Sequence, residues 1–377
     1  MSKRFFRWMI PLLGLFVGSS QAGAGGFFIP EQGTKAVGMA NAFTAIADDV
    51  SANWYNPAGL AFQGTSVMVS GDVLLPKNDY VSGGTTYSAR KKTFVIPQIY
   101  GNYALPGKPI TIGIGINAPF GLSTDWTKSN APFSRVTAGA DSVTFSQIEA
   151  IQSNLNLTYR ISDHFAIAAG GVYYNATKVH LDNALLEIKG DGDGFGGNAA
   201  LIYRDGPFSF GVNYRSRVKI NISGLVTGLA PLGAPFAGMS GGATTSVTLP
   251  DIVMVGAAWQ ATPNLLLTAQ ADWTNWKTFD AINLSFSPSL LNIVTGTSKT
   301  VPENYSATTT LRLGLQWAYS ATNRVRLGYV YDPTPTSPLY VSPRLPGNDR
   351  QLFTAGWGMD VRPNMTIDLA YAYVLLK

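Results

Sequence analysis

Residues 207–220 read Pro-Phe-Ser-Phe-Gly-Val-Asn-Tyr-Arg-Ser-Arg-Val-Lys-Ile, an alternation of apolar and polar side chains. Successive side chains of a β-strand point to opposite faces, so one face of this segment is apolar and the other is strongly basic. Phe208 and Phe210 lie on the apolar face, and Arg215 and Arg217 lie on the basic face. Such alternation, with aromatic residues on the apolar face, is typical of a transmembrane β-barrel with lipid outside and a polar lumen inside.

The same pattern recurs along the chain. We expect thirteen strands, at 65–75, 93–104, 109–118, 143–161, 164–182, 193–205, 207–222, 245–260, 264–286, 307–320, 322–332, 350–362 and 364–376. Short connectors such as Ser162-Asp163 and Asp205-Gly206 suit the periplasmic side, and long ones such as 119–142 and 223–244 suit the extracellular side. The sequence therefore predicts an all-β fold, a transmembrane antiparallel β-barrel over residues 63–377.

The composition agrees with a membrane barrel. The 377 residues are 46% hydrophobic and only 13% charged, which is too apolar for a disordered chain and too poor in charge for an ordinary soluble surface. Beyond the N-terminus there is no apolar run of about 18 residues, so spanning helices are not expected. Forty glycines and 22 prolines suit a chain of many strands and turns.

Residues 1–22 have the basic start, apolar stretch and small-residue end of a secretory signal peptide. Cleavage after Ala22 and cleavage after Ala24 both fit, and the sequence does not choose between them. The three basic residues of this segment account for most of the net charge of +5, so the charge gives no reason to expect a nucleic-acid partner. The absence of cysteine excludes disulfides and thiolate metal sites.

Residues 23–62 differ from the rest because they are rich in small residues and do not alternate. A short helix is expected within 36–47, and 53–59 is a cluster of turn-forming residues. In a barrel wide enough to leave a lumen, such a segment has one natural place, inside the barrel. We therefore expect an N-terminal hatch, or plug, over residues 23–62.

The count of thirteen strands is odd, whereas bacterial single-chain barrels normally have an even number. The chain also stops at Lys377 directly after a strand. The interpretation made from the sequence is that a final loop and strand are missing. The alternative is one miscounted strand.

Seven short motifs occur in a fixed order. They are Ala45–Asp49, Asn56–Ala58, Ala118–Trp126, Asn213–Ser216, Leu249–Asp251, Trp273–Trp276 and Arg344–Arg350. In this order they resemble the FadL-type outer-membrane transporters of long-chain fatty acids and aromatic hydrocarbons. The resemblance implies a fourteen-stranded barrel, a hatch in the lumen, and a kinked third strand that opens a gap through which ligand leaves sideways into the membrane.

A fatty acid needs an apolar slot for its chain and a cation or donors for its carboxylate, because an unpaired desolvated carboxylate is costly. Lys178, Arg215 and Arg217 are the lumen-facing residues that we expect to bind the carboxylate. The alternative is that they pair with acidic lumen residues or water. The resemblance does not assign them, because the family's basic residues carry no sharp motif.

Asn56, Pro57 and Ala58 are expected to form the plug turn. Asn can bond to the backbone that follows it, and Pro fixes φ and stops a helix. The turn is either a plug element that shifts when ligand binds or a static lead into the first strand.

The expected lateral opening lies around the third strand, where Gly permits bulges and Pro removes a hydrogen-bond donor. Its candidate residues are Gly113, Gly115, Pro119, Phe120 and Gly121. An ordinary strand end is the alternative. Apolar residues in the long loops, such as Leu225, Phe236, Leu291 and Val294, suggest either a collecting groove for ligand or loops that pack on themselves.

No catalytic residue, metal site or cofactor is expected. The Asp-containing run at 190–194 has Phe195 where a calcium loop needs an oxygen ligand, so it is interpreted as an acidic turn. His164 and His180 lie at opposite ends of one expected strand, too far apart to share a metal.

The sequence thus predicts a monomeric protein of the Gram-negative outer membrane, in contact with its lipid, that passively transports hydrophobic molecules. Long-chain fatty acids are the first expectation. Aromatic hydrocarbons, and a water-filled porin for small polar solutes, are the alternatives. Capture at the extracellular loops, internal binding and lateral release would make up the route.

Overall fold

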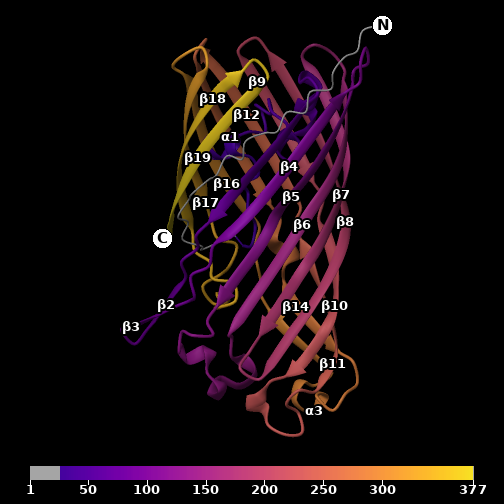
Figure 1. Ribbon diagram of the computed structural model, residues 1–377, viewed down its shortest axis with the longest axis vertical. Coiled ribbons are helices and arrows are strands. Elements are labelled where there is room, and N and C mark those ends of the chain that lie inside the picture. The colour runs from indigo at the N-terminus through magenta and orange to yellow at the C-terminus, as the bar shows by residue number, and fades with distance from the viewer. Residues whose placement is uncertain (1–25, 377) are drawn as a thin grey trace.

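A computed structural model describes residues 26–376. The predicted signal peptide at 1–22, with both cleavage sites, lies outside this range. Figure 1 shows a tall ring of tilted strands, with short turns at its upper end and long loops, including α3, at its lower end. Within the described residues no helix is both long and apolar enough to cross a bilayer.

Nineteen strands lie in the described part of the chain. They are β1 (Ser66–Leu74), β2 (Asp79–Ser82), β3 (Thr85–Ser88), β4 (Phe94–Ala104), β5 (Ile110–Asp125), β6 (Phe145–Arg160), β7 (Phe165–Asp182), β8 (Leu186–Asp205), β9 (Phe208–Arg215), β10 (Val218–Gly228), β11 (Ser240–Leu249), β12 (Ile252–Thr262), β13 (Leu265–Thr274), β14 (Ala281–Phe286), β15 (Ser298–Pro302), β16 (Thr308–Ala318), β17 (Asn323–Asp332), β18 (Arg350–Arg362) and β19 (Met365–Leu376). The helices are α1 (Thr34–Val37), α2 (Ala52–Tyr55), η1 (Pro57–Phe62), η2 (Pro132–Ser134), η3 (Val136–Asp141), η4 (Ala230–Leu232), η5 (Trp276–Thr278) and α3 (Asn292–Thr295).

Antiparallel ladders join seventeen of these strands into one wall, and β2 and β3 form a separate hairpin. The main ring runs β1, β4, β5, β6, β7, β8, β9, β12, β13, β16, β17, β18 and β19. Towards the long-loop end the wall continues as β8, β10, β11, β14 and β15. Among the described residues no ladder joins β1 to β19, so the barrel is open along this seam. The expectation of a further strand after Lys377 stays a prediction.

All thirteen expected segments form strands, but three of them are broken. The expected strands 207–222, 245–260 and 264–286 each divide in two, at neighbouring points of the wall. Pro250 has no N–H for the ladder, and the Asp251 carboxylate accepts hydrogen bonds from the Arg217 N–H (3.1 Å) and the Asn275 side-chain amide (3.2 Å). Asp251 thus ties the three breaks together. β2, β3 and β15 were not expected.

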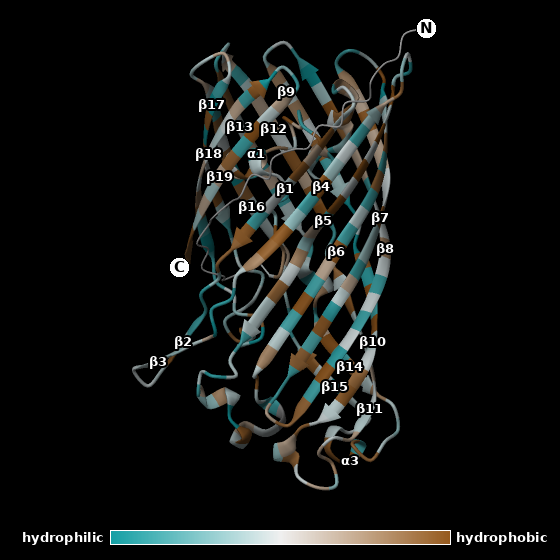
Figure 2. Ribbon diagram, viewed as in Figure 1, coloured by the Kyte–Doolittle hydropathy of each residue, from teal (hydrophilic) through white to brown (hydrophobic). Residues whose placement is uncertain are grey.

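The two faces of the wall have opposite character, as the alternating brown and teal bands in Figure 2 show. Leu155 and Leu157 on β6 are 59% and 58% exposed, whereas Asn154 and Asn156 between and beside them are buried. On this strand apolar side chains face outward and polar side chains face the lumen, whereas strands such as β10 and β14 also bury apolar side chains, among them Ile220 and Leu284. An apolar outer face is the arrangement that a lipid-exposed barrel requires, and it confirms the predicted fold.

Residues 27–62 lie inside this wall and are largely buried. The expected helix over 36–47 is wrong beyond Val37, where α1 ends; Ala40 and Asn41 both have φ near +59°. The backbone here forms successive turns and also bonds to the wall. The Ala40 N–H donates to Thr354 Oγ1 at 3.1 Å, and the Thr44 N–H donates to Gln270 Oε1 at 2.8 Å.

Candidate functional site

The wall has a gap between β4 and β5. β5 pairs with β6 from Ile110 to Asp125 with one irregularity, but it pairs with β4 only up to Ile116, opposite Ile99. The remaining part of β4, residues 94–98, pairs with β1 alone. The seam between β4 and β5 is therefore closed near the short turns and open further along.

The N-terminal segment takes the place of β4 beside the open part of β5. The Ile29 N–H donates to the Pro119 carbonyl oxygen at 2.8 Å, and the Gly121 N–H donates to the Phe27 carbonyl oxygen at 3.0 Å. Pro119 itself has no N–H to satisfy. The hatch thus supplies partners for backbone groups that would otherwise face an apolar opening, where unpaired groups are costly.

The five residues expected at the opening fall into two groups. Pro119, Phe120 and Gly121 lie at the break in pairing. Gly113 and Gly115 lie where β5 is paired on both sides. A Cβ at Gly113 would come within 2.2 Å of the Asn53 side-chain oxygen, so this glycine makes room for the hatch.

A cavity of about 320 Å³ lies at the gap. Its wall includes residues from both faces of the same strands: Ile96 is 8% exposed and faces the interior, whereas its neighbour Val95 is 69% exposed and faces outward. On β6 the buried Ala150 and the outward-facing Ile151 line it together. The cavity therefore extends from the lumen through the wall to the lipid-facing surface.

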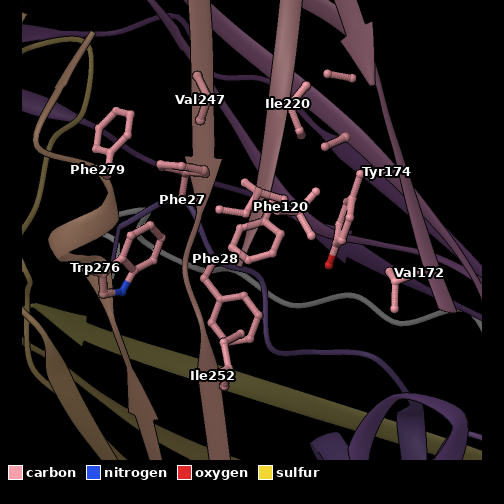
Figure 3. Packing of buried hydrophobic residues seen from close by; sticks show 14 of the residues in the cluster. Phe27, Phe28, Phe120, Val172, Tyr174, Ile220, Val247, Ile252, Trp276 and Phe279 are labelled. Atoms are coloured by element: carbon pink, nitrogen blue, oxygen red, sulfur yellow. The ribbon is translucent and has the colours of Figure 1, made fainter. Parts of the chain in front are cut away.

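Phe27, Phe28 and Phe120 line this cavity and belong to the aromatic cluster in Figure 3. The ring centroid of Phe27 lies 5.1 Å from that of Trp276 and 5.2 Å from that of Phe279, in edge-to-face geometry. Phe28 and Phe120 are 5.2 Å apart. Such pairs add about 0.5–1.5 kcal/mol each beyond area burial, so the cluster fixes the hatch against the wall.

The polar groups that line the cavity are mainly acidic: Glu31, Asp72 and Glu149. Burial raises the pKa of the Glu31 carboxyl, and Arg350 opposes this only in part. Arg350, the one basic residue that the described chain contributes to the lining, is already paired, with its Nε 2.5 Å from the Asp332 carboxylate. The cavity thus combines an apolar lining with three acids, of which Glu149 alone is ion-paired within the described residues, with Lys178.

The three residues expected to bind a carboxylate have partners within the protein. Lys178 Nζ lies 3.0 Å from Glu149 Oε2, and Arg217 Nε lies 2.9 Å from Asp251 Oδ2. The buried Arg215 stacks on the Trp54 ring of the hatch at 3.9 Å. None of the three lines the 320 Å³ cavity, and their role in ligand binding stays a prediction.

The plug turn has the geometry expected of its residues. α2 ends at Tyr55, and the Ala58 N–H donates to Asn56 Oδ1 at 3.1 Å. The Asn56 side-chain amide also donates to the carbonyl oxygens of Thr44 (2.8 Å) and Leu201 on β8 (2.9 Å). The turn is therefore bonded to the wall in this structure; whether it moves stays a prediction.

A second cavity, of about 80 Å³, lies at the long-loop end. Its apolar lining comes largely from β8 and β14, through Ile188, Ile282 and Leu284. Val294 of α3 adds an apolar side chain from the loops. Strand ends and a loop thus enclose one apolar space at this end of the barrel.

The other apolar residues expected in the loops divide between packing and exposure. Leu291 is buried in the main hydrophobic cluster, and Phe236 packs against it. Leu225, in contrast, lies on β10 and not in a loop, and it is 56% exposed. Both interpretations of the apolar loops therefore stay open, with the loop-end cavity as the place where ligand could collect.

Two basic residues, Lys299 and Arg344, complete this loop-end cavity. Burial lowers the pKa of the Arg344 guanidinium, and the carboxylate of Glu303 acts against that shift. Burial also raises the pKa of Glu303 to about 7. Sequence reasoning missed this site because its cations and apolar residues come from separate strands and loops.

The comparisons with known proteins agree with this geometry. A family model described as "Outer membrane protein transport protein (OMPP1/FadL/TodX)" matches residues 15–377. The chain belongs to this family. It is therefore an outer-membrane protein of a family of transporters, not enzymes, that carry hydrophobic compounds.

Individual relatives are distant but cover nearly the whole chain. The long-chain fatty acid transport protein of Escherichia coli is 23% identical over 94% of this chain and 88% of its own length. A FadL homologue of Pseudomonas aeruginosa matches with a TM-score of 0.75 at 20% identity, over 93% of this chain and 91% of that one. The toluene transporter TbuX of Ralstonia pickettii matches with a TM-score of 0.68 at 18% identity, over 92% and 93%. Both structures support the fold.

Proposed function

We propose that this protein passively carries hydrophobic compounds from the long-loop end, through an internal site, and sideways into the membrane at the gap between β4 and β5. The observation that supports lateral release is the cavity lined by both the inward-facing Ile96 and the outward-facing Val95. A ligand in this cavity touches hatch and outer wall together. It can therefore pass into lipid without crossing a polar layer.

Uncharged compounds, aromatic hydrocarbons among them, are the substrates that we propose first. The sequence favoured long-chain fatty acids, but a carboxylate in the gap cavity would lie beside the buried acids Glu31 and Asp72. Desolvation opposes that placement because Arg350, the basic residue of the lining, is already paired with Asp332, and Glu31 and Asp72 add repulsion when they are ionised. The toluene transporter of R. pickettii is a structural neighbour with an uncharged substrate in its name.

Long-chain fatty acids remain the second candidate because of the loop-end cavity. Lys299 and Arg344 there lie beside Leu284 and Ile282, which is the combination that a fatty acid needs for its head and chain. The E. coli relative is named for long-chain fatty acids. A water-filled porin is disfavoured because buried hatch residues, such as Trp54, occupy the lumen.

The test places a bulky side chain at the outer side of the gap cavity and measures uptake. Val95→Trp, on β4, should reduce uptake of both toluene and oleate to the level of cells that lack the protein. Val67→Trp is the matched control, since Val67 is 61% exposed on the neighbouring β1 but does not line the cavity. If both variants transport like the parent protein, the gap is not the exit. Large, steady single-channel conductance of the parent protein would favour the porin.

A further inference from the structure

Three side chains converge where the long-loop ends of β7 and β8 meet. Asp182, the last residue of β7, lies directly opposite Glu187 in the antiparallel ladder. His180 precedes Asp182 by two positions, so the two share one face of the strand. The tight connection between the strands thus brings an imidazole and two carboxylates together.

The donor atoms have the separations of a metal-ligand set. His180 Nε2 lies 2.7 Å from Asp182 Oδ1 and 3.5 Å from Glu187 Oε1, and the three donor atoms lie within 4.8 Å of one another. With metal–ligand bonds of about 2.1 Å, tetrahedral donors lie about 3.4 Å apart. Small side-chain movements would place all three around one ion.

Two of these atoms are shielded from solvent and face each other. His180 Nε2 lies 2.7 Å from Asp182 Oδ1, so the imidazole already directs this nitrogen at the carboxylate. The Phe145 ring, with its centroid 4.7 Å from that of the imidazole, packs against His180 and limits its freedom to turn towards water.

We propose that His180, Asp182 and Glu187 bind a divalent transition-metal ion, with Zn²⁺ as the representative. One imidazole and two carboxylates suit zinc, and water can complete the coordination. Lys189 Nζ, now 2.6 Å from Glu187 Oε1, is half-exposed and can turn into solvent when the ion binds. The ion would link the ends of β7 and β8, away from the gap between β4 and β5. Asp182 also lines the loop-end cavity, so the ion would lie beside the proposed entrance for ligand.

The sequence pointed away from a metal because it contains two histidines at opposite ends of one strand. The proposed site needs only one of them. Its other ligands come from the same strand end and from the partner strand, and the pairing of Asp182 with Glu187 becomes visible only in the ladder.

Isothermal titration of the purified, detergent-solubilised protein with ZnCl₂ tests this proposal. We expect one saturable site, weakened by at least about tenfold in His180→Ala and in Glu187→Gln. His164→Ala is the matched control, since His164 lies at the other end of β7, 3.9 Å from a single carboxylate, that of Asp205. It should bind Zn²⁺ like the parent protein.

Three outcomes would overturn the site: no saturable binding to the parent protein, equal binding by His180→Ala, or loss of binding in His164→Ala. Thermal unfolding gives a second readout that does not depend on transport. Zn²⁺ should raise the unfolding temperature of the parent protein and of His164→Ala, but not that of His180→Ala. An equal rise in all three proteins would also contradict the proposal.

Discussion

The two seams of β5 differ sharply, although they share one strand. Towards β6, pairing continues from Ile110 to Asp125 with a single irregularity; towards β4 it stops at Ile116. The opening is therefore not a weakness of β5 itself. It arises because one neighbour departs and the hatch backbone at 27–29 takes its place.

This difference shows how a barrel can open sideways at low cost. Backbone groups exposed to hydrocarbon without partners are expensive. Hydrogen bonds from Ile29 to Pro119 and from Gly121 to Phe27 keep such groups satisfied at the gap. The position of the hatch and the state of the gap should therefore depend on each other.

The largest expected effect comes from displacing the hatch. Gly26 has φ near +66°, and a Cβ there would lie 2.4 Å from the Trp276 ring. Gly26→Ala should shift residues 27–29 and break their bonds to β5, because the ring is held in the aromatic cluster. Hydrogen exchange at the Ile29 and Gly121 amides should become much faster.

Gly107→Ala is the control for that prediction. Gly107 has nearly the same φ, +67°, but a Cβ there meets open space. Gly107→Ala should lower the free energy of unfolding only by the roughly 1 kcal/mol of backbone strain. Equal exchange rates in the two variants would show that the hatch does not depend on this contact.

A smaller effect is expected from loosening the hatch at a distance from the gap. Arg215→Met removes the guanidinium from the Trp54 ring and from Gln152 Oε1, which it contacts at 2.7 Å. A desolvated cation–π contact contributes about 2 kcal/mol, so thermal unfolding should occur at a lower temperature. Arg217→Met, at an exposed side chain, should have a smaller effect. If Arg217→Met lowered the unfolding temperature more than Arg215→Met, Arg215 would not be the residue that holds the hatch.

Charge removal in the gap cavity should alter substrate preference. In the double variant Glu31→Gln/Asp72→Asn, oleate uptake relative to toluene should rise by about tenfold, equivalent to ~1.4 kcal/mol of relieved repulsion. Toluene uptake itself should change little. An unchanged ratio, measured with both substrates in the same cells, would remove the electrostatic reason for placing uncharged substrates first.

The smallest effect concerns pH at the long-loop end. Because burial raises the pKa of Glu303 from 4.5 to about 7, this carboxyl is protonated in the folded protein where the unfolded chain would already be ionised. Its contribution to stability should therefore be lost as pH rises from about 4.5 to 7. Glu303→Gln should flatten this part of the stability profile. An identical slope in parent and variant would rule out Glu303 as the cause.

The strands were predictable because their signal is local. Leu155 and Leu157 face out while Asn154 and Asn156 face in, as their alternation requires. Pro119 lies at the irregularity of the β5–β6 ladder, and its role in a lateral opening stays a prediction.

Features that depend on distant partners were not predictable. Ala36–Ala47 has helical composition, yet the wall side chains Thr354 and Gln270 capture its backbone. Lys178 and Arg217 alternate like lumen cations, but their acidic partners are 29 and 34 positions away in the sequence. The acidic lining of the gap cavity combines the hatch with several strands, and no local pattern predicts that combination.

Photo-crosslinking with a diazirine-labelled alkane, followed by mass spectrometry, tests lateral release most directly. The account predicts labelling of Phe120 from the lumen side together with Val95 and Ile151 on the outer side of the gap, and loss of the outer labels in Val95→Trp. Labelling that runs instead from the lumen to the short-turn end of the barrel, with none at Ile151, would contradict exit through the wall.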